Sequence, residues 1–146
     1  MTFLKAVDTC LLDKFFVFRG RASRSEFWYF MLFQSMLQMA CAVWLGHGSI
    51  YSIFLAAILA VPTVTAAVRR LHDIDRPGWW LLLLHVLPAG AAMAGACIGM
   101  FIYGTREAVI IDTGFGFIAG YIVMMVRFFC RPGTEGENSF GPDPEA

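Results

Sequence analysis

The chain has few charged residues for its length. Only 15% of its 146 residues are Asp, Glu, Lys or Arg, whereas 58% are hydrophobic, and typical soluble domains carry roughly 25% charged residues. The formal net charge is zero, and the sequence has no basic tail or block of like charge. Together with a mean hydropathy of +0.65, this composition argues against a soluble domain and against nucleic acid as a partner.

Motifs typical of catalysis or metal binding are also missing. The sequence has no G-x-S-x-G, Walker A, GxGxxG or HExxH pattern, so we expect no enzyme activity and no cofactor or metal. No cleavable signal peptide is expected, because the first apolar run follows about 26 residues that include acids. Free thiols are expected because no two of the cysteines form a CxxC pair: Cys10, Cys41, Cys97 and Cys130.

Long apolar runs dominate the rest of the sequence. Four of them approach or exceed the ~20 residues needed to cross the hydrocarbon core of a bilayer. We therefore expect an all-α integral membrane protein with four transmembrane helices arranged as two hairpins. The predicted spans are residues 27–45, 50–68, 79–103 and 109–129.

Local signals predict where some of these helices begin and end. Ser23, followed three residues later by Glu26, matches a capping box, which predicts that a helix begins near Arg24. Short turns are expected at residues 46–49 and 104–108, between the spans of each hairpin.

Two further patterns concern the helix interiors. Pro62 lies inside the second predicted span and should kink it, while the hydroxyls of Thr63 and Thr65 can satisfy the freed carbonyls. The third and fourth spans each contain a GxxxG motif, at residues 95–99 and 116–120. Small residues let helices approach closely, so these two spans are predicted to pack tightly.

The segments outside the spans differ in character. Residues 3–18 carry an apolar stripe at helical spacing, formed by Leu4, Val7, Leu11 and Phe18. This pattern predicts an amphipathic helix in the plane of the membrane interface, although a loosely ordered terminus is the alternative. Residues 1–26 are thus expected to form an interfacial helix and a basic segment. Residues 131–146, rich in proline and glycine, are expected to form a water-exposed tail.

The basic residues predict the orientation. With four spans and a cytoplasmic N-terminus, ten of the eleven basic residues lie on or near the cytoplasmic side, and only Arg106 lies outside. This positive-inside bias predicts that both termini are cytoplasmic. The ten residues are Lys5, Lys14, Arg19, Arg21, Arg24, Arg69, Arg70, Arg76, Arg127 and Arg131.

A cytoplasmic hinge is predicted at residues 69–78, between the second and third spans. Its three guanidinium groups near one membrane surface are typical of a site for phosphate or anionic lipid. A structural network that holds the hairpins together is the alternative. A metal site formed by His72, Asp73 and Asp75 is disfavoured by the nearby cations and lacks an established spacing. The candidate polar cluster is Arg19, Arg21, Arg24, Glu26, Arg69, Arg70, His72, Asp73, Arg76, Trp79 and Trp80.

Three polar residues within the predicted spans are candidates for a functional role. Gln34 and Gln38 share one face of the first span at i and i+4, and His85 lies in the third. Such side chains usually hydrogen-bond to a neighbouring helix. The functional interpretation is a polar path through the membrane, with His85 as a proton relay.

Three sequence blocks resemble a known family. The blocks are Phe18-Arg-Gly-Arg-Ala-Ser-Arg-Ser-Glu-Phe-Trp28; Arg69-Arg-Leu-His-Asp73 with Arg76 and Gly78-Trp-Trp80; and Pro132-Gly-Thr-Glu-Gly-Glu-Asn138 with Phe140-Gly-Pro-Asp-Pro144. Together they resemble the small bacterial inner-membrane family called domain of unknown function 805. The resemblance implies a polytopic inner-membrane protein and no established activity. Many members of this family are expected to have Gly in place of Asp75 and Ser in place of Pro77.

The resemblance suggests how the blocks interact. We expect the first and second blocks to meet on the cytoplasmic face, where Glu26 and Asp73 pair with arginines of the other block. The tail is expected to fold over them. A charge swap between Glu26 and Arg70 would test this arrangement.

The leading functional hypothesis is a non-enzymatic inner-membrane module. It would bind anionic lipid headgroups, a membrane protein partner or a second copy of itself through the cytoplasmic polar cluster. The alternative is a small oligomeric transporter or channel subunit that uses Gln34, Gln38 and His85. A lipid-modifying enzyme that uses His72 and Asp73 is a third hypothesis.

Overall fold

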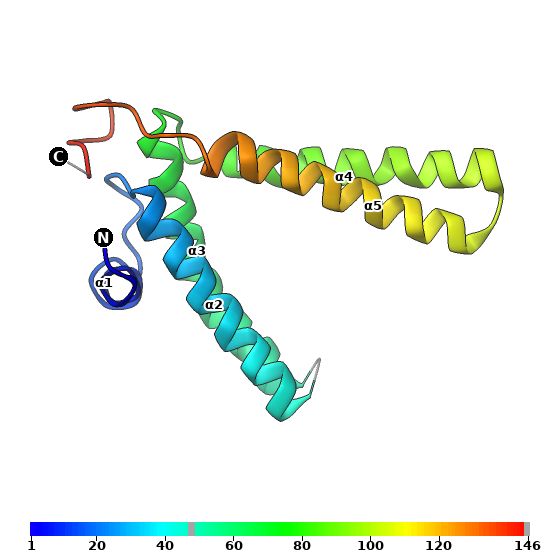
Figure 1. The fold of residues 1–146 in the computed structure, drawn as a ribbon, viewed down its shortest axis with the longest axis horizontal. Coiled ribbons are helices and arrows are strands. Elements are labelled where there is room, and N and C mark those ends of the chain that lie inside the picture. Colours follow the sequence, from blue (N-terminus) through cyan, green and yellow to red (C-terminus); the bar gives the residue numbers. More distant parts are fainter. Residues whose placement is uncertain (47–48, 145–146) are drawn as a thin grey trace. The chain divides into compact units, whose positions relative to one another are not determined.

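The computed structural model describes residues 1–46 and 49–144, and within these ranges every regular element is helical. Figure 1 shows the elements in chain order. Five are α-helices and three are π-helical turns that extend them: α1 (Phe3–Asp8), η1 (Thr9–Asp13), α2 (Arg24–Leu45), α3 (Ile50–Asp73), α4 (Trp80–Ile98), η2 (Gly99–Tyr103), α5 (Arg106–Met124) and η3 (Met125–Phe129). The predicted all-α class is confirmed.

Four of these helical segments are long and apolar enough to cross a membrane. They are Arg24–Leu45, Ile50–Asp73, Trp80–Tyr103 and Arg106–Phe129. The four predicted transmembrane helices are therefore present, and α2 begins at the residue that the capping box indicates, since the Ser23 hydroxyl accepts from the Glu26 N–H at 3.3 Å. Residues 47 and 48 of the predicted turn at 46–49 lie outside the described residues.

Two helix boundaries differ from the prediction. The second span was expected to end at Val68, but α3 continues through five more residues to Asp73. The fourth was expected to begin at residue 109 after a turn over residues 104–108, but α5 begins at Arg106. In both cases the predicted apolar span leaves out charged residues that the helix itself includes. In α5 the Thr105 hydroxyl caps the helix by accepting from the Ala108 N–H at 3.2 Å.

The C-terminal end of α3 has an unusual residue in a standard capping motif. The Arg76 N–H donates to the Leu71 carbonyl at 2.9 Å, and the Asp75 N–H donates to the His72 carbonyl at 3.0 Å. These two bonds define a Schellman motif, in which the residue after the cap is left-handed and usually glycine. Here that residue is Asp75, with φ of 55°.

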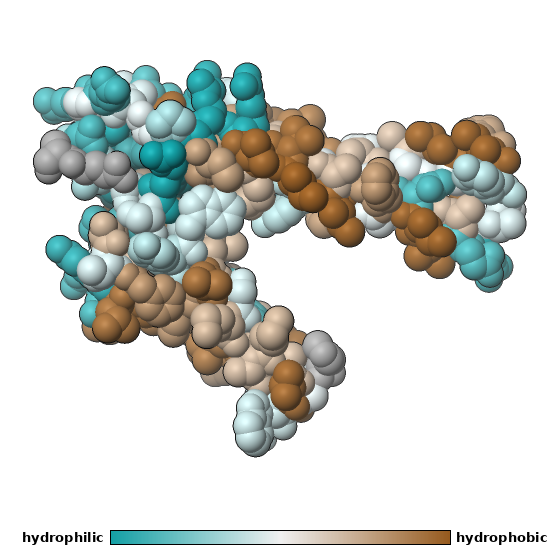
Figure 2. Space-filling model, viewed as in Figure 1, coloured by the Kyte–Doolittle hydropathy of each residue, from teal (hydrophilic) through white to brown (hydrophobic). Residues whose placement is uncertain are grey.

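The chain divides into two compact units, which are described separately. The first contains Met1–Gly78 and the tail from Pro132, and the second contains Trp79–Arg131. Each unit includes one pair of long helices, α2 with α3 and α4 with α5. Figure 2 shows mainly apolar residues along the visible face of each pair, as expected for surfaces that face lipid.

In the first unit, polar groups hold α2 against α3. The Thr63 hydroxyl lies within hydrogen-bond distance of the Gln34 side-chain oxygen and of the Leu59 carbonyl. The Thr65 hydroxyl donates to the Pro62 carbonyl at 3.0 Å. The two hydroxyls therefore bond to carbonyls on either side of the proline turn, whereas the carbonyl that Pro62 leaves without its helical N–H donor is that of Ile58, four residues earlier.

The N-terminal helix is shorter than predicted. It ends at Asp13 with η1 and does not continue to residue 18. Its buried face consists of Ala6, Thr9 and Cys10. Leu4, from the predicted apolar stripe, is 73% exposed, so it lies on the surface of the helix and not against the rest of the first unit.

In the second unit, glycines bring the α4 and α5 backbones together. A Cβ atom on Gly95 would collide with the Asp112 carbonyl, and one on Gly116 would collide with the Ala91 carbonyl. Gly99 and Gly120 face the opposite backbone in the same way. The tight packing predicted from the two GxxxG motifs is confirmed.

Candidate functional site

A cluster of charged side chains lies buried in the first unit. It forms where the segment before α2, the last turns of α3 and the tail meet. Arg69 and Arg70 are 0% exposed and Arg21 is 5% exposed. Arginines are rarely buried this deeply unless carboxylates pair with them.

The ion pairs of this cluster join the first two sequence blocks. The Arg21 Nε lies 2.9 Å from Asp73 Oδ1, and the guanidinium of Arg69 pairs with the carboxylate of Glu26. Arg70 pairs with the other oxygen of Asp73 within α3. Both carboxylates thus pair across the blocks, as expected, but the partner of Glu26 is Arg69, and Arg70 pairs with Asp73.

The tail closes over this cluster through backbone contacts. The Arg21 guanidinium donates to the carbonyls of Thr134 and Gly136, each at 2.5 Å. The Thr134 N–H donates to the Asp73 carbonyl at 2.8 Å. Any side chain on Gly133 would collide with the Asp73 carboxylate. The tail is therefore more than the water-exposed extension that its composition suggested.

His72 fixes the tail from the adjacent position of α3. Its ring stacks on Phe140 with a centroid distance of 4.0 Å and an interplanar angle of 4°. Its Nδ1 lies 3.1 Å from the Gly20 carbonyl, and because a carbonyl can only accept, this nitrogen carries the proton. The Asn138 amide donates to the His72 carbonyl at 2.9 Å.

Cys10 lies beside the second ion pair. Its sulfur is 3.9 Å from Glu26 Oε1 and 3.7 Å from an Arg69 nitrogen. Burial, reinforced by the negative charge of Glu26, raises the pKa of the Cys10 thiol from 9.0 to about 11. The thiol is therefore neutral at physiological pH and joins the N-terminal helix to the cluster as a packed, weakly polar group.

The charges of the cluster nearly balance. Three guanidinium groups face two carboxylates, and the carbonyls of the tail satisfy further N–H groups of Arg21. Removing one member of a buried ion pair typically costs about 3–5 kcal/mol, because the remaining charge is left without a partner. The arrangement is thus suited to holding three chain segments in place.

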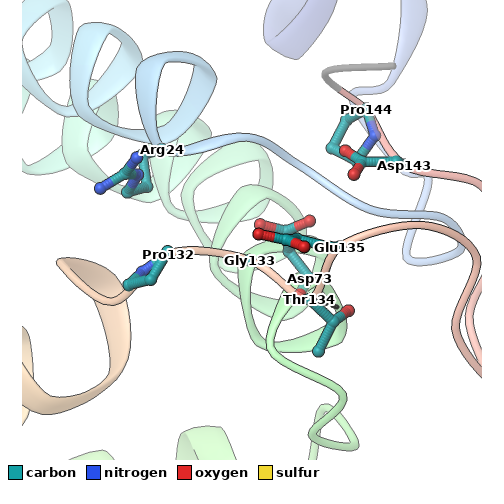
Figure 3. A pocket seen from close by; sticks show the side chains of 8 residues that line it. All are labelled: Arg24, Asp73, Pro132, Gly133, Thr134, Glu135, Asp143 and Pro144. Atoms are coloured by element: carbon teal, nitrogen blue, oxygen red, sulfur yellow. Dashed lines mark hydrogen bonds between the residues drawn. The ribbon is translucent and has the colours of Figure 1, made fainter.

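Two pockets border the cluster. One of about 230 Å³ is lined by Arg24, Asp73, Pro132, Gly133, Thr134, Glu135, Asp143 and Pro144, which Figure 3 shows. A second of about 790 Å³ lies beside the N-terminal helix and includes Lys5 and Lys14. Among residues 1–46 and 49–144, no group of three or more His, Cys, Asp or Glu side chains could hold a metal ion.

The structure brings together six residues of the predicted cluster. They are Arg21, Glu26, Arg69, Arg70, His72 and Asp73. Arg19, Arg24 and Arg76 are exposed, and Trp79 and Trp80 belong to the second unit, where the Trp80 ring lies 5.5 Å from that of Phe128.

Two of the three candidate intramembrane polar residues, Gln34 and His85, have hydrogen-bond partners. Gln34 packs against Thr63 of the neighbouring helix, and Gln38 is half-buried on the same helix. His85 is exposed on α4, and its Nδ1 lies 2.9 Å from the Leu81 carbonyl of its own helix. Sequence reasoning expected a partner on another helix for His85.

Several residues of the site were not singled out from the sequence. Cys10, Gly133, Thr134, Asn138 and Phe140 all contact the cluster. Gly133, Thr134, Asn138 and Phe140 lie in the third sequence block, and membership of this block was the one sequence feature that could have indicated them. Nothing in the sequence indicated Cys10.

Comparisons with known proteins agree with this architecture. Residues 15–142 match the family described as "Protein of unknown function (DUF805)". The chain is 31% identical over 144 residues to Inner membrane protein YhaH of Escherichia coli (strain K12), covering 92% of this chain and 93% of that protein. It is 31% identical over 142 residues to Inner membrane protein YhaI of the same organism, covering 92% of each. It is 30% identical over 144 residues to Uncharacterized protein YiiR, covering 89% and 87%. No solved structure matches the chain.

Proposed function

Because the chain belongs to the DUF805 family, as its three sequence blocks indicated, we propose that it is a non-enzymatic inner-membrane module that binds anionic lipid headgroups. The binding surface is the basic N-terminal segment, residues 1–19, in which three basic residues outnumber the two acidic ones, Asp8 and Asp13. The buried ion pairs hold this segment and the tail on the ends of α2 and α3.

The observation that carries this proposal is the exposed surface of α1, η1 and the residues that follow. Leu4 is 73% exposed, Leu12 is 76% exposed and Phe16 is 72% exposed. Large apolar side chains at the surface of a segment joined to a transmembrane helix favour insertion into the membrane interface. The opposite face cannot be available to lipid, because it is buried against the helices of the first unit.

The charges next to this apolar surface select the lipid. Lys5, Lys14 and Arg19 form no ion pair within residues 1–46 and 49–144. Basic residues near a membrane surface each contribute about 1 kcal/mol to binding of anionic lipid. The buried arginines of the cluster do not take part, since carboxylates and tail carbonyls already occupy them.

The orientation is part of the proposal. Both termini lie in the cytoplasm, because ten of the eleven basic residues then lie on or near that side. A C-terminal alkaline phosphatase fusion should be inactive and a C-terminal fluorescent protein fusion should be bright. The reverse pattern would place the polar cap outside. This polar cap consists of the charged cluster, the N-terminal segment and the tail.

The geometry of the cluster supports a binding role more than a catalytic one. Both oxygens of Asp73 are engaged by arginines, and the His72 ring is stacked on Phe140. Asp73 is therefore not available as a general base, and stacking together with the contact of Nδ1 with the Gly20 carbonyl holds the His72 ring in place. The relatives also point to no enzyme family. Within the described part of the chain, the contacts of Gln34 and His85 are with Thr63 and with the Leu81 carbonyl, and neither favours a polar path through the membrane.

Native mass spectrometry of the protein in detergent with added phosphatidylglycerol tests lipid binding. The triple variant Lys5→Gln, Lys14→Gln, Arg19→Gln should retain phosphatidylglycerol about a hundredfold less tightly, as expected for three lost charges. Arg106→Gln is the matched control, because it removes the one basic residue on the other side of the membrane. Equal retention by the triple variant and the wild type would contradict the proposal.

A further inference from the structure

The 230 Å³ pocket beside the cluster has an unusual charge pattern. It is formed by the first residue of α2, the last residue of α3 and the tail, and Figure 3 shows the side chains that line it. It does not include Lys5, Lys14 or Arg19, the residues of the basic N-terminal segment. Any ligand of this pocket is therefore recognised by different groups.

Two of the three carboxylates in the pocket already have partners. Asp73 is paired with Arg21 and Arg70, one on each oxygen. Asp143 accepts from the Gly136 N–H at 3.2 Å and makes a further interaction. These two groups hold the walls of the pocket together.

The remaining charges are Arg24 and Glu135. Both side chains are exposed, and neither forms an ion pair within residues 1–46 and 49–144. A cation and an anion thus line one small cavity, on separate elements, without neutralising each other. This pattern is complementary to a ligand that carries both charges.

The position of the pocket indicates what the ligand is. Arg24 is the first residue of a transmembrane helix, which places it at the level of the lipid headgroups. A guanidinium binds a phosphate through two parallel hydrogen bonds, and a carboxylate accepts short, strong hydrogen bonds from a primary ammonium. The volume equals roughly seven or eight water molecules at ~30 Å³ each, which is enough for one such headgroup.

We propose that this pocket binds a ligand with a phosphate and a primary ammonium, the chemistry of a phosphoethanolamine headgroup. Arg24 binds the phosphate and Glu135 binds the ammonium. Gly133 allows the tail to lie against Asp73, so that Glu135 is held over the end of α3. The inference shares with the proposed function the placement of the cap at the membrane surface, but it rests on other residues.

The test is retention of phosphatidylethanolamine by the full-length protein, measured by native mass spectrometry. Arg24→Gln and Glu135→Gln should each weaken retention about tenfold. Glu137→Gln is the matched control in the tail and Arg19→Gln the control in the basic segment, and neither should change it. Unchanged melting temperatures of the variants show that binding, and not folding, is affected, which is expected because both side chains are exposed.

Two further probes identify the part of the ligand that is recognised. Phosphatidylcholine should bind the wild type about as weakly as phosphatidylethanolamine binds Glu135→Gln, because its trimethylammonium group has no N–H to donate. Soluble phosphoethanolamine, added without lipid, distinguishes a free metabolite from a membrane lipid as the source. Tight binding of either source that depends on both residues supports the proposal.

Equal binding of phosphatidylethanolamine and phosphatidylcholine, or wild-type retention by Glu135→Gln, would overturn the inference. The outcomes separate the two proposals. If the Lys5, Lys14 and Arg19 variant loses phosphatidylglycerol while Glu135→Gln still binds phosphatidylethanolamine, the proposed function is supported. In that case only the inferred phosphoethanolamine site is wrong.

Discussion

The two compact units are held together by different kinds of contact. In the first, buried ion pairs such as Arg21 with Asp73 hold the chain segments together. In the second, glycines such as Gly95 and Gly116 allow two backbones to touch. The first unit depends on long, charged side chains, and the second depends on positions that have no side chain.

The difference follows from the surroundings of each region. A buried ion pair is tolerated at the end of a helix, where the arginines can also reach backbone carbonyls of the tail. Within lipid, apolar surfaces gain little from contacting each other, so helices associate through close backbone packing. Substitutions should therefore have large effects through charge in the first unit and through volume in the second.

The largest effect is expected for Asp73→Ala. It leaves the buried Arg21 and Arg70 without their carboxylate, which should destabilise the first unit by about 3–5 kcal/mol. The tail should then become sensitive to limited proteolysis, while α4 and α5 keep their hydrogen-exchange protection.

Asp75→Gly is the control for this change, because it removes an exposed carboxylate two residues away and glycine is unstrained in the left-handed conformation of this position. A tail that stays protected in Asp73→Ala would show that the ion pairs do not hold it.

Cys10 tests whether the first unit is closed. With a pKa of about 11 instead of 9.0, its thiolate fraction at neutral pH is about a hundredfold smaller than that of an ordinary thiol. The proton is retained below pH 9 and is lost only as the pH approaches 11. Iodoacetamide at pH 8 should therefore modify the exposed Cys130 at least a hundredfold faster. Similar rates for the two cysteines would mean that the cluster opens to solvent.

A matched pair of glycines tests the second unit. Gly116→Ala places a methyl group against the Ala91 carbonyl and should destabilise the hairpin by about 1–3 kcal/mol. Gly114→Ala, two residues earlier in α5, points into open space and should be neutral or stabilising by up to about 1 kcal/mol. Thermal unfolding in detergent measures both changes. The same sign for both variants would be inconsistent with close packing at Gly116.

The smallest effect concerns the end of α3. Asp75 adopts a left-handed conformation with φ of 55°, in which glycine is unstrained. Asp75→Gly should therefore be neutral or stabilise the first unit by up to about 1 kcal/mol, and Asp75→Val should destabilise it. Equal melting temperatures for the glycine and valine variants would show that this conformation is not required.

The sequence predicted the architecture well because its signals are local. Apolar runs of sufficient length located the four spans, and Ser23 with Glu26 located the start of α2. The GxxxG motifs predicted which helices pack closely, because the absence of a side chain lets the backbone of the neighbouring helix approach. The family resemblance predicts that many members have glycine in place of Asp75. The Schellman motif explains this, because the residue at this position adopts a left-handed conformation that favours glycine.

The site was predicted only in part, because its contacts are not local. Charge alone could not distinguish Arg69 from Arg70 as the partner of Glu26, since consecutive helical residues point about 100° apart. The helix α3 continues past the predicted end of the span at Val68. Arg69 and Arg70 can be buried in its last turns because carboxylates pair with them, so they need not reach solvent. The tail is held largely through its backbone carbonyls, which every residue has and no side-chain pattern reveals.

The central claim is that ion pairs between the first and second sequence blocks hold the polar cap together. A double-mutant cycle on Glu26 and Arg69 tests it most directly, using Glu26→Leu, Arg69→Leu and the double variant. Glu26 with the exposed Arg24 provides the control cycle. Each single change in the first cycle should cost about 3–5 kcal/mol, and the double variant should recover much of the loss, because no charge is then buried alone. Costs that add within about 0.5 kcal/mol would mean that the two residues act independently, and the account of the cap would be wrong.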